Sequence, residues 1–228
     1  MNIQQPQWEH SYRNRDNFLF YPHEEIIRFV SKYIRKQVGL NEYHPQPEAA
    51  VDPVKFLDVG CGIGRHLVYA HRMQLEPYGI DLSLFAVDTA RRWAEAEGIS
   101  EVTERIRQGD VRHLPWPDDF FQVAVSHGVF DSMHFEVAVA AIQEVSRVLG
   151  KGCLFYLDLV AHPEGSAGEE TVQTAHEQGT VQSYFTPEKI ALLLGDCFEV
   201  VETVLIKRES LPSHVRSHRY HLVLRNLK

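Results

Sequence analysis

The sequence predicts a single α/β domain built on a mostly parallel sheet with helices on both faces. Three observations support this fold class. From residue 54 onward, short apolar runs alternate with amphipathic stretches of helical period, which is typical of βαβ units. A glycine-rich turn joins the first apolar run to the first of these helices. The chain has 228 residues, of which 44% are apolar and 24% charged, enough for one sizeable core.

The first part of the chain precedes this alternation. Residues 1–21 form a polar arm with interspersed aromatic side chains. A helix is expected over residues 22–39, because Pro22 suits a first turn, apolar residues recur at helical spacing and Gly39 supplies a stop. Residues 40–53 contain three prolines and are expected to form a loop.

The alternating part of the chain follows in a regular order. The expected strands are 54–59, 77–80, 105–108, 122–126 and 153–160, and the expected helices are 65–73, 84–97 and 135–149. Residues 161–185 lack periodicity and are long for a connection, so they are a candidate lid loop or a disordered insertion. Thr186 then caps a short helix that ends at Leu194. Two strands, 198–206 and 220–224, are expected to close the chain as an antiparallel pair with a loose connection.

Composition narrows the classes of partner. The net charge of −8 disfavours a nucleic-acid polymer, because phosphate binding needs a basic face. Cys61, Cys153 and Cys197 are far apart in apolar surroundings and are expected to be reduced thiols. No signal-peptide pattern and no apolar run of membrane-span length is found. We therefore expect a cytoplasmic protein without a nucleic-acid or membrane partner.

The glycine-rich turn predicts the type of ligand. Gly60, Gly62 and Gly64 let the backbone turn sharply and approach a ligand, and the helix behind them offers free N–H groups. A nucleotide-like ligand at the carboxyl ends of the strands is therefore expected. Asp58 would repel a pyrophosphate, and Arg65 replaces the third glycine of the dinucleotide fingerprint. The turn thus favours S-adenosylmethionine, which has no phosphate and carries cationic groups, over NAD(P).

Further acidic residues stand at the ends of later strands. Asp81 ends the second strand, where a carboxylate can accept both ribose hydroxyls, and Leu82 is placed to cover one face of the adenine. Asp110 follows the third strand and suits the adenine amino group, with the backbone N–H of Val111 beside it. The alternative roles are helix capping for Asp58 and Asp81 and a turn position for Asp110.

In order and spacing, these motifs resemble those of class I S-adenosylmethionine-dependent methyltransferases. The matching segments are residues 58–64, 78–81, 108–111 and 120–129. Residues 114–121 also resemble a segment of the small-molecule branch, with Gln122 where that branch usually has Asp. The resemblance implies a three-layer sandwich with a doubly wound, seven-stranded sheet whose last strand is antiparallel. It also implies S-adenosylmethionine as cofactor and a small molecule as methyl acceptor.

The resemblance further implies which residues lie at the cofactor. The glycines would make backbone contacts to the methionine part, and Ser126 and His127 would lie near it. Because many relatives fold a flap over the cofactor, residues 1–21 are a candidate flap ahead of a domain spanning 22–228. The residues expected at the cofactor are Tyr12, Tyr21, Asp58, Gly60, Cys61, Gly62, Gly64, Arg65, Asp81, Leu82, Ser83, Asp110, Val111, Ser126 and His127.

Methyl transfer from a sulfonium needs alignment and exclusion of water, and a base only where the acceptor must lose a proton. The candidate bases near the strand ends are His127, His134, Tyr156, Asp158 and His162, with His127, His134 and Asp158 preferred. O- or N-methylation without a metal is expected, because Ser126-His127 stands where a catechol-type magnesium site would want Asp. Three alternatives stay open: an NAD(P)-dependent oxidoreductase, a non-catalytic S-adenosylmethionine-binding module, and protein or RNA methylation.

Overall fold

The computed structural model describes residues 4–49 and 52–228. Its centre is a seven-stranded sheet with the strand order β10-β11-β7-β6-β3-β4-β5. The strands are β3 (Lys55–Val59), β4 (Glu76–Asp81), β5 (Ile106–Gln108), β6 (Phe121–Ser126), β7 (Leu149–Ala161), β10 (Phe198–Ser210) and β11 (Val215–Asn226). All neighbours from β5 to β7 are parallel, whereas β11 is antiparallel to both β7 and β10. The predicted sheet with an antiparallel last strand is therefore confirmed.

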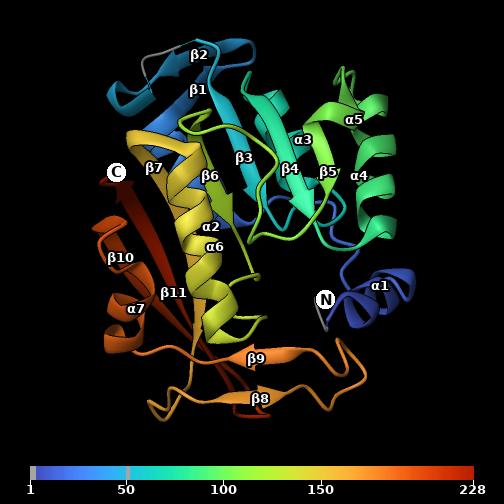
Figure 1. Ribbon diagram of the computed structural model, residues 1–228, viewed down its shortest axis with the longest axis vertical. Coiled ribbons are helices and arrows are strands. Elements are labelled where there is room, and N and C mark those ends of the chain that lie inside the picture. The colour runs from blue at the N-terminus through green and yellow to red at the C-terminus, as the bar shows by residue number, and fades with distance from the viewer. Residues whose placement is uncertain (1–3, 50–51) are drawn as a thin grey trace.

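Helices cover both faces of the sheet, as Figure 1 shows. They are α1 (Gln5–Arg13), α2 (Glu24–Phe29), α3 (Arg65–Arg72), α4 (Leu84–Ala96), α5 (Val102–Arg105), α6 (Phe135–Val148) and α7 (Pro187–Leu194). Side chains alternate across a strand, so Leu57 and Val59 of β3 pack in the core with α6 and α7, and Phe56 in the core with α2 and α3. The predicted three-layer arrangement is confirmed.

The segment expected to be one helix over 22–39 is divided into three parts. After α2, a π-helical turn occupies Val30–Ile34, and strand β1 (Arg35–Gly39) follows. The helix prediction was wrong beyond Ile34, because the buried apolar positions end there: Val38 is 44% exposed. Without a face to bury, the backbone pairs instead with the neighbouring segment.

That neighbouring segment was expected to be a loop. It contains strand β2 (Glu42–Pro45), antiparallel to β1, and a 3₁₀ turn, Pro47–Ala49. Arg35 is buried and donates from Nη1 to the carbonyl of Gln74 at 2.6 Å, which ties this hairpin to the connection between α3 and β4. The pairing joins residues with no apolar alternation, so the sequence pattern could not reveal it.

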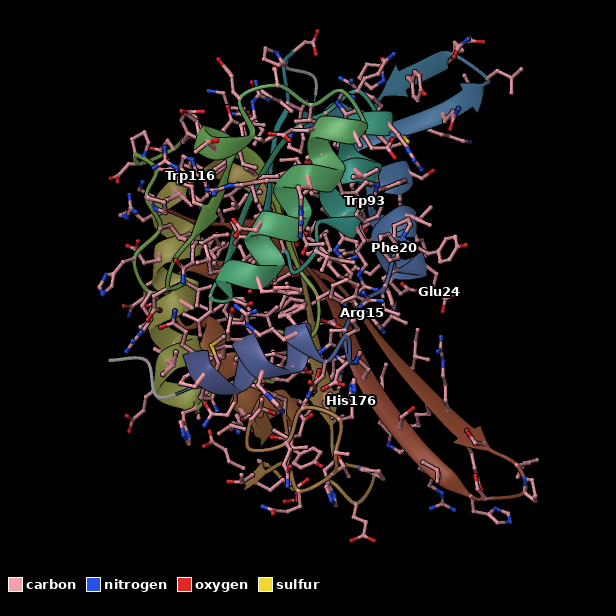
Figure 2. The ribbon with its side chains drawn as sticks, turned by 90° about the vertical axis from the view of Figure 1, so that its right-hand side faces the viewer. Arg15, Phe20, Glu24, Trp93, Trp116 and His176 are labelled. Carbon is pink, nitrogen blue, oxygen red and sulfur yellow. The ribbon has the colours of Figure 1, made fainter. Side chains whose placement is uncertain are left out.

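Two connections in the C-terminal third are also more ordered than expected. Residues 161–185 contain a small hairpin of β8 (Glu169–Thr171) and β9 (Val181–Ser183). Strands β10 and β11 continue in register as far as Ser210 and Val215, so the connection predicted to be loose is a long hairpin. In Figure 2 the end of this hairpin projects from the body of the molecule. Backbone pairing, rather than burial, holds it together, because residues 207–217 are exposed.

The remaining predicted elements lie within a few residues of their expected bounds. Thr186 caps α7 as predicted, its hydroxyl accepting from the backbone N–H of Lys189 at 3.3 Å. The short helix α5 was not predicted. Over the residues that the structure describes, no helix combines the length and apolar character needed to span a membrane.

Candidate functional site

A cavity of about 430 Å³ opens at the carboxyl ends of β3, β4 and β6. Figure 1 shows α1 and the β8–β9 hairpin beyond these strand ends. Both contribute to the cavity wall, with Trp8 and Tyr12 from α1 and with Glu177 and Gln182 from the hairpin. Parallel α/β sheets bind ligands at this edge, where the strand order changes direction.

The glycine-rich turn after β3 forms one wall of the cavity and has no space for side chains. Gly62 has a φ of +53°, and a Cβ there would lie 2.6 Å from the hydroxyl of Tyr12. A Cβ on Gly60 would collide with Val129. Gly64 has a different role. A Cβ at this position would lie 3.1 Å from the Cβ of Ala90 and would hold α3 away from α4. Backbone atoms of the first two glycines therefore face the ligand, and the third permits close helix packing.

Asp58 lies behind this turn and is 1% exposed. Neither carboxylate oxygen forms a hydrogen bond with any described residue, and Nδ1 of the His66 ring lies 3.4 Å from Oδ2. Nε2 of His66 accepts from the backbone N–H of His23 at 3.3 Å. A buried carboxylate without hydrogen bonds is costly unless an opposite charge approaches it. The cationic amino group of S-adenosylmethionine fits this requirement.

Asp81 connects the end of β4 to the glycine-rich turn. Its Oδ2 accepts from the N–H of Gly62 at 2.8 Å, and its Oδ1 accepts from the N–H of Ser83 at 2.9 Å. Burial raises the pKa of Asp81 to about 6, against the lowering effect of these two N–H groups. Each oxygen keeps a lone pair, so the carboxylate can still accept from a ligand diol. Ser83 is fully buried and caps α4 through its hydroxyl.

The adenine side of the predicted site has one unexpected partner. Leu82 and Val111 line the cavity, and so does Arg112, which the sequence did not single out. The Arg112 guanidinium binds both oxygens of Asp110, with its shortest contact at 2.6 Å. Burial raises the pKa of Asp110, but the hydrogen bonds from Arg112 lower it by more, so the pKa of Asp110 lies below its ordinary value.

Four histidine rings gather beside the glycine-rich turn. The centroid of His127 lies 4.0 Å from that of His23 and 6.0 Å from that of His66, and His23 stacks on His221 at 5.7 Å. Burial lowers the pKa of His23 to about 4 and that of His127 well below its ordinary value, with Asp158 acting in the opposite direction. These two rings are therefore neutral at pH 7.

Both nitrogens of His127 face protein groups. Nδ1 lies 3.2 Å from Nη2 of Arg65, and because a guanidinium only donates, Nδ1 is the acceptor. Nε2 is buried and lies 3.3 Å from Oδ2 of Asp158. Arg65 itself makes no ion pair with a carboxylate among the described residues. It lines the cavity as a cation whose pKa is lowered by burial.

A second charged group joins β7, β11 and the loop after β6. Nη1 of Arg219 donates to Oδ2 of Asp158 at 2.6 Å and to Oδ2 of Asp131 at 2.9 Å. Both carboxylates are buried, whereas the Arg219 side chain is 29% exposed and lines the cavity. Burial raises the pKa of Asp131 to about 6, whereas the guanidinium of Arg219 and the N–H of Gly128 hold the pKa of Asp158 at about 2 despite its burial.

His134 lies at the cavity wall where α6 begins. Its Nδ1 is 2.8 Å from Oε2 of Glu169 in β8, and the other carboxylate oxygen accepts from the N–H of Phe135 at 2.7 Å. The other ring nitrogen, Nε2, has no hydrogen bond to a described residue. This is a histidine oriented by a carboxylate, with one nitrogen left over for another group.

The residues predicted from the sequence divide into three groups. Those that line the cavity are Tyr12, Gly60, Cys61, Gly62, Arg65, Asp81, Leu82, Val111, His127 and His134. Those that lie behind its wall are Asp58, Gly64, Ser83, Asp110, Ser126 and Asp158. Tyr21 is 84% exposed and lies outside the wall, as do Tyr156, bonded to His221, and His162, against Tyr184.

Sequence reasoning missed several cavity residues and their supports. Arg219, Ser132 and Gln182 line the cavity. Asp131 accepts a hydrogen bond from Arg219, and the backbone N–H of His23 donates to His66, which also lines the cavity. None belongs to a recognisable local motif, because each is brought in by an element remote in sequence. Within the described part of the chain, no group of three or more His, Cys, Asp or Glu side chains is arranged to hold a metal ion.

Comparisons with known proteins agree with this geometry. Residues 56–152 match a family model described as a methyltransferase domain. The chain therefore contains a methyltransferase domain, and its fold and glycine-rich turn are those of class I S-adenosylmethionine-dependent methyltransferases. The cofactor of that class is S-adenosylmethionine.

Individual relatives are more distant. Ajmaline N-methyltransferase of Rauvolfia serpentina is 28% identical over 182 residues, which cover 75% of this chain but only 60% of that enzyme. A SAM-dependent methyltransferase from Methanosarcina mazei superposes with a TM-score of 0.64 at 21% identity, covering 78% of this chain and 94% of its own. The 1,6-didemethyltoxoflavin-N1-methyltransferase of Burkholderia thailandensis, solved with S-adenosylhomocysteine, superposes with a TM-score of 0.58 at 18% identity. The match covers 77% of this chain and 72% of that enzyme.

Proposed function

We propose that this protein transfers a methyl group from S-adenosylmethionine to oxygen or nitrogen of a small-molecule acceptor, without a metal. The observation that carries the proposal is Asp58, a buried carboxylate that forms no hydrogen bond with a described residue and lies behind a glycine-rich turn whose Gly60 and Gly62 line the cavity. That combination suits a cationic, phosphate-free nucleoside. It disfavours NAD(P), whose pyrophosphate would be repelled at the same position.

The roles of the cavity residues follow from their partners. From behind the cavity wall Asp58 would bind the amino group. Arg65 lines the cavity, has no carboxylate partner among the described residues and would bind the carboxylate of the methionine part. Asp81 would accept the ribose hydroxyls, and Leu82 and Val111 would enclose the adenine. The cofactor supplies an already activated methyl group, so these residues have to bind it, orient it and keep water away.

The N-terminal arm is proposed to act as a flap. Glu9 of α1 accepts from the hydroxyl of Ser83 at 2.7 Å and from the N–H of Phe85 at 3.1 Å, at the start of α4. Asn17 donates to Oε1 of Glu177 at 2.7 Å, which joins the arm to the β8–β9 hairpin. In Figure 2, His176 of this hairpin lies close below α1. The arm and the hairpin thus meet over the cavity.

His134 is proposed as the base where the acceptor must lose a proton. Glu169 orients its Nδ1, and Nε2 remains for the acceptor. For His127 we propose a role in the pocket wall instead, because Arg65 and Asp158 face its two nitrogens. A metal-free reaction is proposed because Ser126-His127 stands at the end of β6, where a magnesium site would want Asp, and Ser126 donates its hydroxyl to the carbonyl of Val59.

Ligand binding tests the proposal directly. S-adenosylhomocysteine at ~100 times its Kd should stabilise the protein by about 2.7 kcal/mol in thermal or urea unfolding. NADH at the same concentration should produce no stabilisation. A response to NADH alone would replace the proposal with an oxidoreductase. Release of S-adenosylhomocysteine from a panel of hydroxyl and amine acceptors would separate an enzyme from a module that only binds the cofactor.

The kind of acceptor is suggested by the relatives. Ajmaline N-methyltransferase and the didemethyltoxoflavin enzyme are both named for small-molecule acceptors, which supports the same class here. A net charge of −8 agrees with an acceptor other than nucleic acid.

A further inference from the structure

Part of the cavity is left over once the proposed cofactor contacts are assigned. Those contacts use the glycine-rich turn, the end of β4 and the loop after β5. The remaining wall comes from the β6–α6 loop, the start of α6, β9 and β11, and it contains Met133, Val137, Gln182 and Arg219. This is the acceptor end of the cavity, and the inference below rests on the proposed function.

Arg219 is the charged group that an acceptor meets at this end. Its hydrogen bonds to described residues all use Nη1, so Nε and Nη2 remain available. The guanidinium cannot swing away, because Asp131 and Asp158 hold Nη1 at 2.9 and 2.6 Å. A guanidinium fixed in this way presents its remaining N–H groups in a defined direction, which favours bidentate binding of a carboxylate.

The neighbouring carboxylates do not compete for the cavity surface. Asp158 is fully buried, with Oδ1 accepting from the N–H of Gly128 at 2.7 Å, and Asp131 is 1% exposed, with Oδ2 accepting from the N–H of Val160 at 3.1 Å. Glu177 accepts from Asn17. The carboxylates of Asp131 and Asp158 are therefore turned into the protein, while the Arg219 guanidinium faces the cavity. Burial also raises the pKa of Asp131 to about 6, so proton uptake there can offset an incoming anion.

Beside the polar Gln182 and His134, this wall also has apolar side chains. Met133 is 9% exposed and Val137 is half-buried, and both line the cavity, as do Trp8 and Leu19 from the N-terminal arm. An acceptor that fits this surface has an apolar body and one anionic end. We propose that the methyl acceptor is a small carboxylic acid with an apolar body, whose carboxylate is bound by Arg219.

Binding of benzoate tests this assignment without knowledge of the natural acceptor. Benzoate, benzylamine and benzyl alcohol share an apolar ring and differ in charge, and each is titrated calorimetrically into the protein with and without saturating S-adenosylhomocysteine. We expect benzoate to bind and the other two to bind at least about tenfold more weakly. Preference for benzylamine, or no benzoate binding at 10 mM (a concentration on the order of ten times a ~1 mM Kd), would overturn the proposal.

Variants locate the site. Replacing Arg219 alone would leave Asp131 and Asp158 unpaired, so the double variant Arg219→Gln/Asp131→Asn keeps the charge balanced. It should lose benzoate affinity by about tenfold or more and retain S-adenosylhomocysteine affinity within about twofold. If the double variant does not fold, Arg219→Lys replaces it in the test. Lysine keeps the positive charge but lacks the planar guanidinium that binds a carboxylate bidentately, so benzoate affinity should fall in this variant as well.

The matched control is Arg216→Gln, an exposed arginine on the same strand whose one ion pair with a described residue is to Glu209. It should bind benzoate as the wild type does. Unchanged benzoate affinity in the Arg219 variants would overturn the assignment. Failure of S-adenosylhomocysteine to bind the wild type would instead refute the proposed function, and the titrations without it would still report on the anion site.

Discussion

Replacement of Asp81 by asparagine should make the free protein more stable and its cofactor binding weaker. Asp81 is a buried carboxylate whose pKa rises from 3.8 to about 6, mainly because burial disfavours its charged form. A carboxyl group with a raised pKa destabilises the fold once it ionises. Its contribution is therefore most favourable below pH 3.8 and is lost as the pH rises to about 6.

The magnitude follows from the same pKa values. A rise from 3.8 to about 6 corresponds to about 3 kcal/mol of destabilisation at pH 7.5. Asparagine removes the charge, but its amide nitrogen faces one of the two N–H groups of Gly62 and Ser83, which costs about 1–1.5 kcal/mol. Asp81→Asn should therefore raise the free energy of unfolding by about 1.5–2 kcal/mol at pH 7.5 and by about 0–0.5 kcal/mol at pH 5, where the native Asp81 is largely protonated and only about half of the destabilisation has developed.

Urea unfolding at the two pH values measures this difference, and calorimetry with S-adenosylhomocysteine measures the functional cost. Affinity should fall by about tenfold or more, because a charged hydrogen-bond acceptor for the ribose is lost. Asp88→Asn, on the exposed face of α4, is the control and should change neither quantity. Destabilisation of Asp81→Asn at pH 7.5, or wild-type affinity for S-adenosylhomocysteine, would refute the reasoning.

Three further predictions follow from the site. His134→Ala should lower kcat by ~10²–10⁴ with little change in cofactor affinity, and Glu169→Gln by less; equal activity of His134→Ala and wild type in steady-state assays would remove His134 as the base. His127→Ala should weaken S-adenosylhomocysteine in calorimetry, and a selective loss of kcat would instead make His127 the base. Deletion of residues 1–20 should leave the circular dichroism spectrum and cooperative unfolding intact, because Tyr12 packs in a small cluster outside the main cores, but should abolish turnover; full activity would show that α1 only packs against the surface.

Local patterns determined the order of the elements and the chemistry of the glycine-rich turn. Strand and helix periods, and glycines followed by a helix start, depend on residues adjacent in the chain. Asp58 and Asp81 could be singled out because each stands at the end of an apolar strand. The pattern failed at residues 35–45, where exposed strands pair without any alternation of apolar and polar side chains.

Tertiary structure alone decided which side chains meet at the cavity. His23, His66, His127 and His221 come from four separate segments, and their rings meet only when the sheet has assembled. Arg219 finds Asp131 and Asp158 across 88 and 61 residues of chain. Their burial, which sets their pKa values and fixes the guanidinium, depends on packing between distant elements. A single sequence contains no local signal for it, because side-chain burial is a property of the assembled core.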